Sequence, residues 1–574
     1  MNLYKIYLDK IKDKLLKHKN TININSLKDL NSIVIENPPE KFDYDFSSNA
    51  AMVLAKRLKD NPKNIAEKIK NILNDELNDF SSINIAGPGF LNFKLTKNSW
   101  INIIEKIIKT KKNFGSNDDK KKYNIEFVSA NPTGPMHVGH CRGAIFGDVL
   151  SNLLIFNGNK VTKEFYINDY GSQINDFAES VYFRLRELKL NENFPNKKNL
   201  YPGEYIKNIA KKIILSKPKI NLDNYIKISK FLKKKSINYS MDLIKYDLKQ
   251  LGIKHDYFFS ETKIVKENLV NKAINKLKKN KFVFEGFLDP PKGEASLEWK
   301  KEKRLIFKST LFGDDLNRAL KKNDGTWTYF ANDIAYHSKK ISRKFDNLIN
   351  ILGADHVGYI KRIKAAVTAL SNSKVQLICK VCQLVKLYKN GSPFKMSKRL
   401  GDFITVGDLL KEVNKDSIRF MMLNRSNDVE LDFDFNKVLE KNKENPVFYV
   451  QYTYARINSL FNSANLNLKS KINLNPDNFI LNNFESRLLR KIVEWPRVVH
   501  LASSKFEPHR IPFYLYELAT IFHSYWSKGN EDSNFKFITN SKPNNLNTFK
   551  IFQLLAIVLN NSMGILGVSL PKKM

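Results

Sequence analysis

Two histidines separated by Val and Gly are the first residues whose types and spacing could do chemistry. They stand in the segment His137-Val138-Gly139-His140, directly after a turn rich in Pro and Gly. Imidazoles can hydrogen-bond phosphate oxygens as charge builds on them, and Gly139 would let a nucleotide approach the backbone closely. Two incidental loop histidines would look the same, so these four residues alone are a weak signal.

A second group far downstream is rich in cations. Residues 395–399 read Lys395-Met396-Ser397-Lys398-Arg399, and Gly401 follows closely. Lysine acts as a point charge for phosphate oxygens, so this loop suits a polyphosphate. A solvated basic turn is the plain alternative for any single such run in a basic chain. The two motifs together, in this order, are a far more specific signal than either motif alone.

The elements that must position the histidines form a predicted βαβ unit. Residues 125–129 are expected to be a strand, a helix should follow the Pro/Gly turn, and residues 161–167 should be the second strand. A right-handed crossover would place both strands in one parallel sheet. Ligands bind at the carboxyl ends of such strands, and the histidine turn would lie there.

The rest of the chain predicts a multidomain α/β protein. We expect a small α+β domain over residues 1–115 and a Rossmann-like parallel-sheet catalytic core over 120–440. Inside this core, about 175–300 should be a helical insertion and about 390–440 the region of the lysine loop. An all-helical domain should cover 441–574.

Composition limits the classes of partner and the cellular compartment that the protein would suit. The 574 residues contain 96 Lys and Arg against 58 Asp and Glu, a formal net charge of +38. That surplus suits RNA, although the abundance of Lys, Asn and Ile is also what an AT-rich genome would encode. Three cysteines argue against a disulfide framework, and the pair Cys379 and Cys382 lacks further ligands nearby for zinc. No secretory leader is recognisable and the apolar runs are short, so we expect a soluble, cytoplasmic protein.

The paired motifs resemble those of the class I aminoacyl-tRNA synthetases, and the surrounding sequence resembles the bacterial arginyl-tRNA synthetases. The stretch IEFVSANPTGPMHVGHCR at 125–142 carries this resemblance most clearly. Further matching segments are FYINDYGSQI at 165–174, LFGDD at 311–315, TYFANDIAYH at 328–337, GADHVGY at 353–359, RFMMLNRSNDVELDFD at 419–434 and NPVFYVQYTYARIN at 445–458. The resemblance covers nearly the whole chain and is patchy only in the insertion.

The resemblance implies roles for particular residues. His137, His140, Lys395 and Lys398 would be catalytic, and Gly139, Met396, Ser397 and His356 would bind ATP. Glu126, Asn131, Tyr329 and Asp333 would hold the substrate arginine, since carboxylates accept from a guanidinium. Without the resemblance, Asp333 would be a surface charge and Tyr329 a core aromatic.

The resemblance also implies substrates and partners. ATP with Mg²⁺ would activate L-arginine, tRNA(Arg) would accept it, and activation would require bound tRNA. No structural zinc and no membrane contact are expected, and the family suggests a monomer.

Three alternatives stay open from the sequence. The related cysteinyl enzyme would need clustered zinc ligands. An RNA-binding protein without catalysis would be expected to lose one of the two motifs. A general nucleotidyltransferase would usually be far shorter and lack the C-terminal helical domain.

Overall fold

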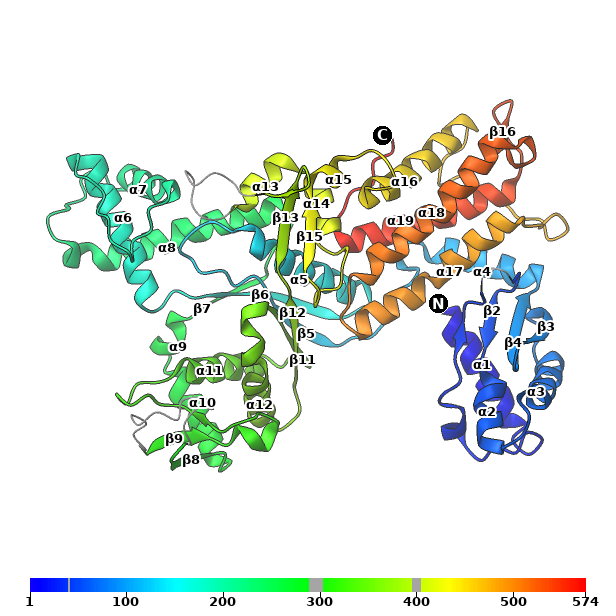
Figure 1. Cartoon of the computed structure of the whole chain (residues 1–574), viewed down its shortest axis with the longest axis horizontal. Helices are drawn as coiled ribbons and strands as arrows, with labels where there is room; N and C mark the ends of the chain where they lie inside the picture. The colour runs from blue at the N-terminus through cyan, green and yellow to red at the C-terminus, as the bar shows by residue number, and fades with distance from the viewer. Residues whose placement is uncertain (40–41, 289–302, 395–403) are drawn as a thin grey trace. The chain divides into compact units, whose positions relative to one another are not determined.

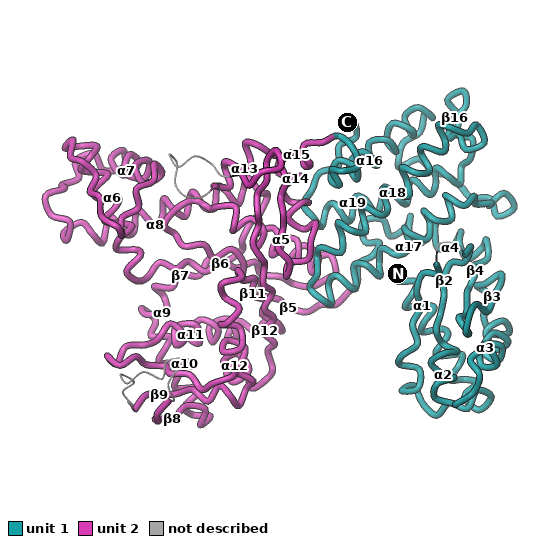
Figure 2. Tube along the Cα trace, in the orientation of Figure 1, with its two compact units in different colours: residues 1–117, 441–574 teal, residues 118–440 magenta. Residues whose placement is uncertain are grey.

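A computed structural model describes residues 1–39, 42–288, 303–394 and 404–574. Contacts divide the chain into two compact units (Figure 2). Residues 1–117 and 441–574 form the first, and residues 118–440 form the second. The first unit therefore unites the two ends of the chain, while the second is one continuous segment.

The N-terminal part of the first unit is an antiparallel sheet with helices. The sheet has the order β1-β2-β4-β3. Pro62 at the first position of α3, with Asn61 as its cap, explains why that helix starts where it does. The elements are α1 (Leu3–Lys17), η1 (Leu27–Leu30), β1 (Ile35–Glu36), β2 (Phe46–Ser48), α2 (Ala50–Leu58), α3 (Pro62–Glu76), β3 (Phe80–Ala86), β4 (Phe90–Leu95), α4 (Lys97–Thr110) and η2 (Lys111–Asn113). The small α+β domain expected from the sequence is thus present.

The C-terminal part of the first unit is built from four long helices (Figure 1). Trp495 is fully buried in α17, and its indole N–H donates to the carbonyl of Phe114 at 3.0 Å. This bond ties the end of the N-terminal segment to the helices. The elements are α16 (Pro446–Ser463), α17 (Asn483–Ser504), α18 (Arg510–Glu531), η5 (Ser533–Phe535), a hairpin of β16 (Ile538–Thr539) and β17 (Lys542–Pro543), and α19 (Leu546–Leu566).

Helix α19 is long and apolar enough to cross a membrane by length and composition. However, 83% of its most apolar window is buried inside the protein. It is therefore packed like the core helix of a globular domain, where a helix that is hydrophobic all round is expected.

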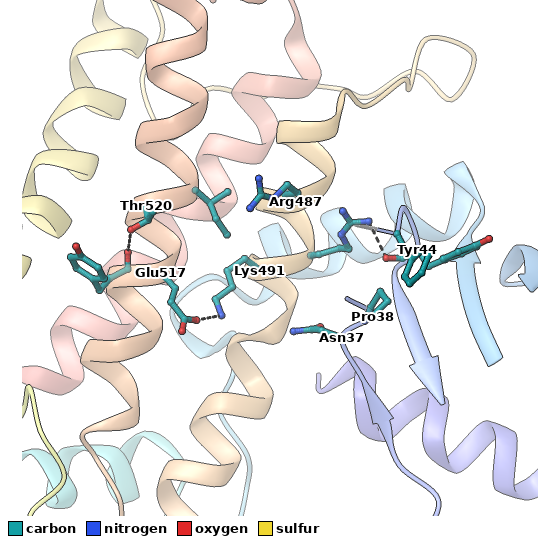
Figure 3. A pocket seen from close by; sticks show the side chains of 11 residues that line it. Asn37, Pro38, Tyr44, Arg487, Lys491, Glu517 and Thr520 are labelled. Atoms are coloured by element: carbon teal, nitrogen blue, oxygen red, sulfur yellow. Dashed lines mark hydrogen bonds and ion pairs between the residues drawn. The ribbon is translucent and has the colours of Figure 1, made fainter. Parts of the chain in front are cut away.

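A pocket of about 470 Å³ lies where the loop before β2 meets α17 and α18 of the first unit (Figure 3). Two of the cations that line it, Lys491 and Arg490, have an acidic and a backbone partner. Lys491 Nζ lies 2.5 Å from Glu517 Oε2, and Arg490 donates to the carbonyl of Tyr44 at 2.9 Å. The Lys491–Glu517 pair joins α17 to α18, and the Arg490–Tyr44 bond joins the helical part of this unit to its α+β part.

A five-stranded parallel sheet forms the core of the second unit. Its order is β12-β11-β5-β6-β7, from the strands β5 (Lys122–Glu126), β6 (Lys160–Ile167), β7 (Tyr257–Ser260), β11 (Asn347–Gly353) and β12 (Gln376–Cys382). The connecting helices include α5 (Val138–Phe156), α11 (Tyr329–Ser342) and α12 (Ile360–Ser371), with η4 (Ala354–Tyr359) between β11 and α12. This confirms the Rossmann-like core and the βαβ unit.

The first core strand ends earlier than the sequence predicts. The strand expected over 125–129 is β5, which stops at Glu126. Val128 and Ser129 have φ of 70° and 43°, in the left-handed region that L residues rarely adopt. Ser129 Oγ instead accepts from the N–H of Tyr166 at 3.1 Å and donates to Glu126 Oε1 at 3.2 Å. This strained turn places Val128 and Ser129 beside a cavity at the carboxyl ends of the strands.

The insertion contains three helices around their own apolar core. They are α6 (Ser172–Leu190), α7 (Glu204–Ser216) and α8 (Tyr225–Gln250). Strand β7, within the range expected for the insertion, belongs to the main sheet. After it come α9 (Thr262–Lys266), α10 (Leu269–Lys279), a small sheet of β8 (Val283–Gly286), β9 (Arg304–Phe307) and β10 (Arg318–Ala319), and η3 (Ser309–Phe312).

A small mixed sheet follows the core strands. It has the order β14-β13-β15, and β13 pairs in parallel with β15. Its elements are β13 (Val385–Lys389), β14 (Ser392–Pro393), α13 (Val406–Glu412), α14 (Lys415–Met421), β15 (Leu431–Asp434) and α15 (Phe435–Leu439). Buried Arg142 of α5 reaches this region and donates to the carbonyls of Gln383, Ser426 and Val429.

Candidate active site

The histidine turn lies at the N-terminus of α5, as the sequence predicts. His137 is the N-cap residue and His140 occupies the first turn, with their ring centroids 3.8 Å apart. A Cβ on Gly139 would come within 2.9 Å of the His137 imidazole, so any larger residue would displace that ring. The arrangement presents two imidazoles at a helix N-terminus, where an anion is favoured.

Both imidazoles are held in the neutral form. Burial lowers the pKa of His137, and burial together with His137 lowers the pKa of His140 to about 4. The backbone N–H of His137 donates to His140 Nδ1 at 3.3 Å. The ring proton of His140 therefore resides on Nε2, which makes this nitrogen a hydrogen-bond donor suited to a phosphate oxygen.

The histidine turn is hydrogen-bonded to the segment that follows the lysine loop. Val138 N–H donates to the carbonyl of Ile404, and Val406 N–H donates to the carbonyl of Met136, both at 2.9 Å. Lys395, Met396, Ser397 and Lys398 themselves lie outside the described residues. The segment leading out of the lysine loop is nevertheless anchored at the histidine turn.

A cavity of about 640 Å³ opens at the carboxyl ends of β5 and β11. Four carboxylates from separate elements line it: Glu126 at the end of β5, Glu261 after β7, Asp333 in α11 and the exposed Asp355 in η4. Tyrosine side chains make up much of the remaining wall, from Tyr166, Tyr329, Tyr336 and Tyr359. Such a cavity is suited to a cationic group with an aliphatic stem.

Asp333 and Glu261 hold protons unusually tightly. Burial raises the pKa of each to about 7, with neighbouring carboxylates adding to the effect. Tyr359 hydrogen-bonds Asp333, and Tyr166 and Asn332 hydrogen-bond Glu261. Sequence reasoning did not single out Glu261. Its position directly after a short apolar strand was the available signal, but β7 was assigned to the insertion.

Glu126 already has a full set of partners. Its Oε2 lies 2.5 Å from Lys340 Nζ and 3.0 Å from the Tyr336 hydroxyl, while Ser129 donates to its Oε1. The side chain of Lys340 is completely buried, and its Nζ also donates to Asn350 Oδ1 at 3.2 Å. Glu126 and Lys340 thus form a buried ion pair in the wall of the cavity, and most of the charge of Glu126 is balanced from within.

Lys340→Met should destabilise the protein strongly. The variant removes the cation and leaves the Glu126 carboxylate buried without its counter-charge, which typically costs about 3–5 kcal/mol. We expect urea denaturation to show a fall of that order in the free energy of unfolding. The double variant with Glu126→Gln should recover part of the loss, and a double variant no more stable than Lys340→Met would contradict the pairing.

The remaining predicted residues lie at the rim of the cavity. Tyr329 is 75% exposed at the start of α11. Asn131 is exposed, donates to Gln173 Oε1 and accepts from Asn168. His356 in η4 is also exposed, 3.4 Å from Asp355. The structure therefore brings all four predicted arginine-binding residues and His356 to one cavity.

The cysteine pair lies in the main parallel sheet. Cys379 and Cys382 lie in β12, and burial raises their pKa values to about 11 and about 12. Among the described residues, no group of three or more His, Cys, Asp or Glu side chains could hold a metal ion.

The parallel sheet with its histidine turn and strand-end cavity has the architecture of a class I tRNA synthetase catalytic domain. The family model for class I tRNA synthetases (R), catalytic domain, matches residues 103–462. The arginyl tRNA synthetase N terminal domain model matches 7–95, and the DALR anticodon binding domain model matches 450–574.

Known relatives agree over the whole length. An arginine–tRNA ligase of Pelagibacter ubique is 51% identical over 577 residues and covers all of both chains, and one of Bartonella bacilliformis is 43% identical with the same coverage. A Campylobacter jejuni structure assigned as an arginyl-tRNA synthetase matches with a TM-score of 0.72 at 30% identity, covering 84% of this chain and 100% of its own. The Thermus thermophilus arginyl-tRNA synthetase shares the fold with a TM-score of 0.71 over 100% of both chains. The chain belongs to the arginyl-tRNA synthetase family.

Proposed function

We propose that this protein is an arginine–tRNA ligase that activates L-arginine with ATP and transfers it to the 3′ end of tRNA(Arg). The observation that carries the proposal is the cavity at the strand ends that the carboxylates of Glu126, Glu261 and Asp333 help to line, in the same unit as the histidine turn. The family assignment, with full-length relatives named arginine–tRNA ligase, supports the same activity.

The cavity would recognise arginine by charge and shape. Asp333 and Glu261 are the acceptors for the guanidinium, because the charge of Glu126 is already balanced by Lys340. Asn131 at the rim would receive the α-amino and carboxylate end, and exposed Tyr329 would cover the aliphatic stem. Glu126 would then contribute to the shape of the cavity wall and to the electrostatic potential inside the cavity.

ATP would bind at the histidine turn. His137 and His140 would donate to the phosphates, and close packing at Gly139 would keep the turn narrow. Met396 and Ser397 would contact the nucleotide, Lys395 and Lys398 would neutralise the pyrophosphate, and His356 would approach the adenosine. The ATP would enter as its Mg²⁺ complex. Arginine attacks the α-phosphate to give arginyl-adenylate and pyrophosphate, and positioning and charge stabilisation account for the catalysis.

Transfer to tRNA would complete the reaction. The 2′-hydroxyl of the terminal adenosine attacks the adenylate carbonyl, giving arginyl-tRNA and AMP. We assign residues 1–115 to the outer corner of the tRNA, 120–440 to catalysis and 441–574 to the anticodon. We further propose that arginine activation requires bound tRNA and that the protein acts as a cytoplasmic monomer.

Arginine binding is expected to release protons near neutral pH. Asp333 and Glu261 have pKa values raised to about 7 in the empty cavity, so a substantial fraction is protonated there. A guanidinium stabilises the ionised carboxylates, so arginine affinity should rise from about pH 6 to about pH 8 and then level off. Calorimetry in buffers of different ionisation enthalpy measures the released protons. Binding without proton release at neutral pH would contradict this assignment.

The direct test of the proposal is aminoacylation. Purified protein, ATP, Mg²⁺ and a tRNA with an arginine anticodon should yield acid-precipitable arginyl-tRNA with labelled arginine and none with labelled lysine. Folded protein that binds this tRNA but charges it with no amino acid would leave a non-catalytic RNA-binding protein.

A further inference from the structure

An acidic side chain of the insertion bonds the peptide that leads into the histidine turn. Asp247 lies in the last turn of α8, and its Oδ2 accepts from the backbone N–H of Met136 at 3.0 Å. Met136 immediately precedes His137 and is completely buried, while Asp247 is only 7% exposed. A carboxylate from the insertion thus caps the peptide that leads into the proposed ATP site.

Three elements far apart in the sequence meet at this peptide. Residues 136–138 bond to Ile404 and Val406, just after the lysine loop, and to Asp247 from the insertion. Two bonds therefore fix the turn from the lysine-loop side and one from the insertion side. Removing Asp247 would leave a buried N–H donor without its acceptor.

Burial disfavours the charged form of Asp247. Burial, with Asp408 of α13 adding to it, raises the pKa of Asp247 to about 6, and the buried Cys141 thiol of α5 faces the same carboxylate. The group is still mostly ionised at neutral pH, so the bond to Met136 is charge-assisted and strong. Burying a carboxylate costs free energy, and here the carboxylate of Asp247 bonds the backbone N–H of Met136. The bond therefore fixes the position of the peptide that precedes His137.

We propose that Asp247 is a positioning residue for adenylate formation, through which the helical insertion holds the histidine turn in the geometry that binds the ATP phosphates. This inference rests on the proposed function. It gives the insertion a role in the chemical step that is separate from any contact with tRNA. Asp247 does not line the arginine cavity, so its effect should fall on ATP and not on arginine.

The test compares Asp247→Ala and Asp247→Asn with Asp242→Asn, which removes the same charge from an exposed position of the same helix. ATP–pyrophosphate exchange is measured with saturating tRNA. Asp247→Ala should lower kcat/KM for ATP by about tenfold or more, and Asp247→Asn, which keeps a carbonyl acceptor, by less. The KM for arginine should stay within about twofold in both, and Asp242→Asn should match the wild type.

The outcomes separate the two proposals. An inactive wild-type protein would defeat the proposed function itself. An active wild type with folded Asp247 variants indistinguishable from Asp242→Asn would overturn the positioning role alone. So would equal losses for ATP and arginine, since these would indicate general disruption. If Asp247→Ala does not fold, Asp247→Asn tests the positioning role in the same way. Its kcat/KM for ATP should fall while its KM for arginine stays within about twofold.

Discussion

Asp333→Asn should nearly abolish arginine activation while leaving the protein folded. The side chain lines the cavity at the strand ends from α11, and we propose its carboxylate as a principal acceptor for the guanidinium of arginine. An amide keeps the shape but offers no charge and one acceptor oxygen. A hydrogen-bonded charge pair of this kind is worth about 3–5 kcal/mol when one partner is removed, so kcat/KM for arginine should fall by about a hundredfold or more. Pyrophosphate exchange at varied arginine concentration measures the change.

Stability provides the internal control for this variant. The folded-state pKa of Asp333, about 7, is above its ordinary value of 3.8, so the carboxylate destabilises the empty protein as pH rises between those values. Asp333→Asn should therefore unfold at the same or a higher temperature than the wild type at neutral pH. Asp223→Asn, at an exposed position in the insertion, should change neither property. Normal arginine kinetics in Asp333→Asn would exclude this residue from recognition.

His140→Ala should reduce the turnover of adenylate formation by about a hundredfold to a thousandfold. The neutral imidazole has its proton on Nε2 and lies in the first turn of α5, where it can donate to a phosphate oxygen as charge develops. Removing one such donor typically has an effect of about this size on kcat. The KM for arginine should change little, because His140 is not among the residues lining the arginine cavity. Single-turnover measurement of adenylate formation gives the rate directly.

A comparison with another histidine controls for this substitution. His500 is exposed in α17 of the other unit, and His500→Ala should retain full exchange activity. His140→Asn, which keeps a hydrogen-bond donor, should lose less activity than His140→Ala. A folded His140→Ala variant with turnover like that of His500→Ala would contradict a role in phosphate binding.

The sequence predicted the elements best where local patterns and packing agree. The helix expected after the Pro/Gly turn is α5, which carries apolar residues from Ile145 to Leu154. The helical domain expected over 441–574 contains four long helices, and each of them buries apolar residues. The β16–β17 hairpin was missed because each strand has only two residues.

The site was predicted in part, through residues next to recognisable motifs. Glu126, Asn131, Tyr329 and Asp333 do meet at one cavity. Glu261 was missed because a four-residue strand inside a lysine-rich helical stretch gives little periodic signal. The pairing of Glu126 with Lys340 was also missed. A buried lysine has no sequence signature, and their contact joins β5 to α11 across the sheet.

The most direct measurement of the central claim is ATP–pyrophosphate exchange with a panel of amino acids, with and without a tRNA that carries an arginine anticodon. The account predicts exchange with arginine only and only when that tRNA is present, because the carboxylate cavity selects the guanidinium and the tRNA completes the site. Exchange supported equally by lysine or by the uncharged isostere citrulline would contradict recognition by Asp333 and Glu261. No exchange with any amino acid from folded, tRNA-binding protein would contradict the catalytic assignment itself.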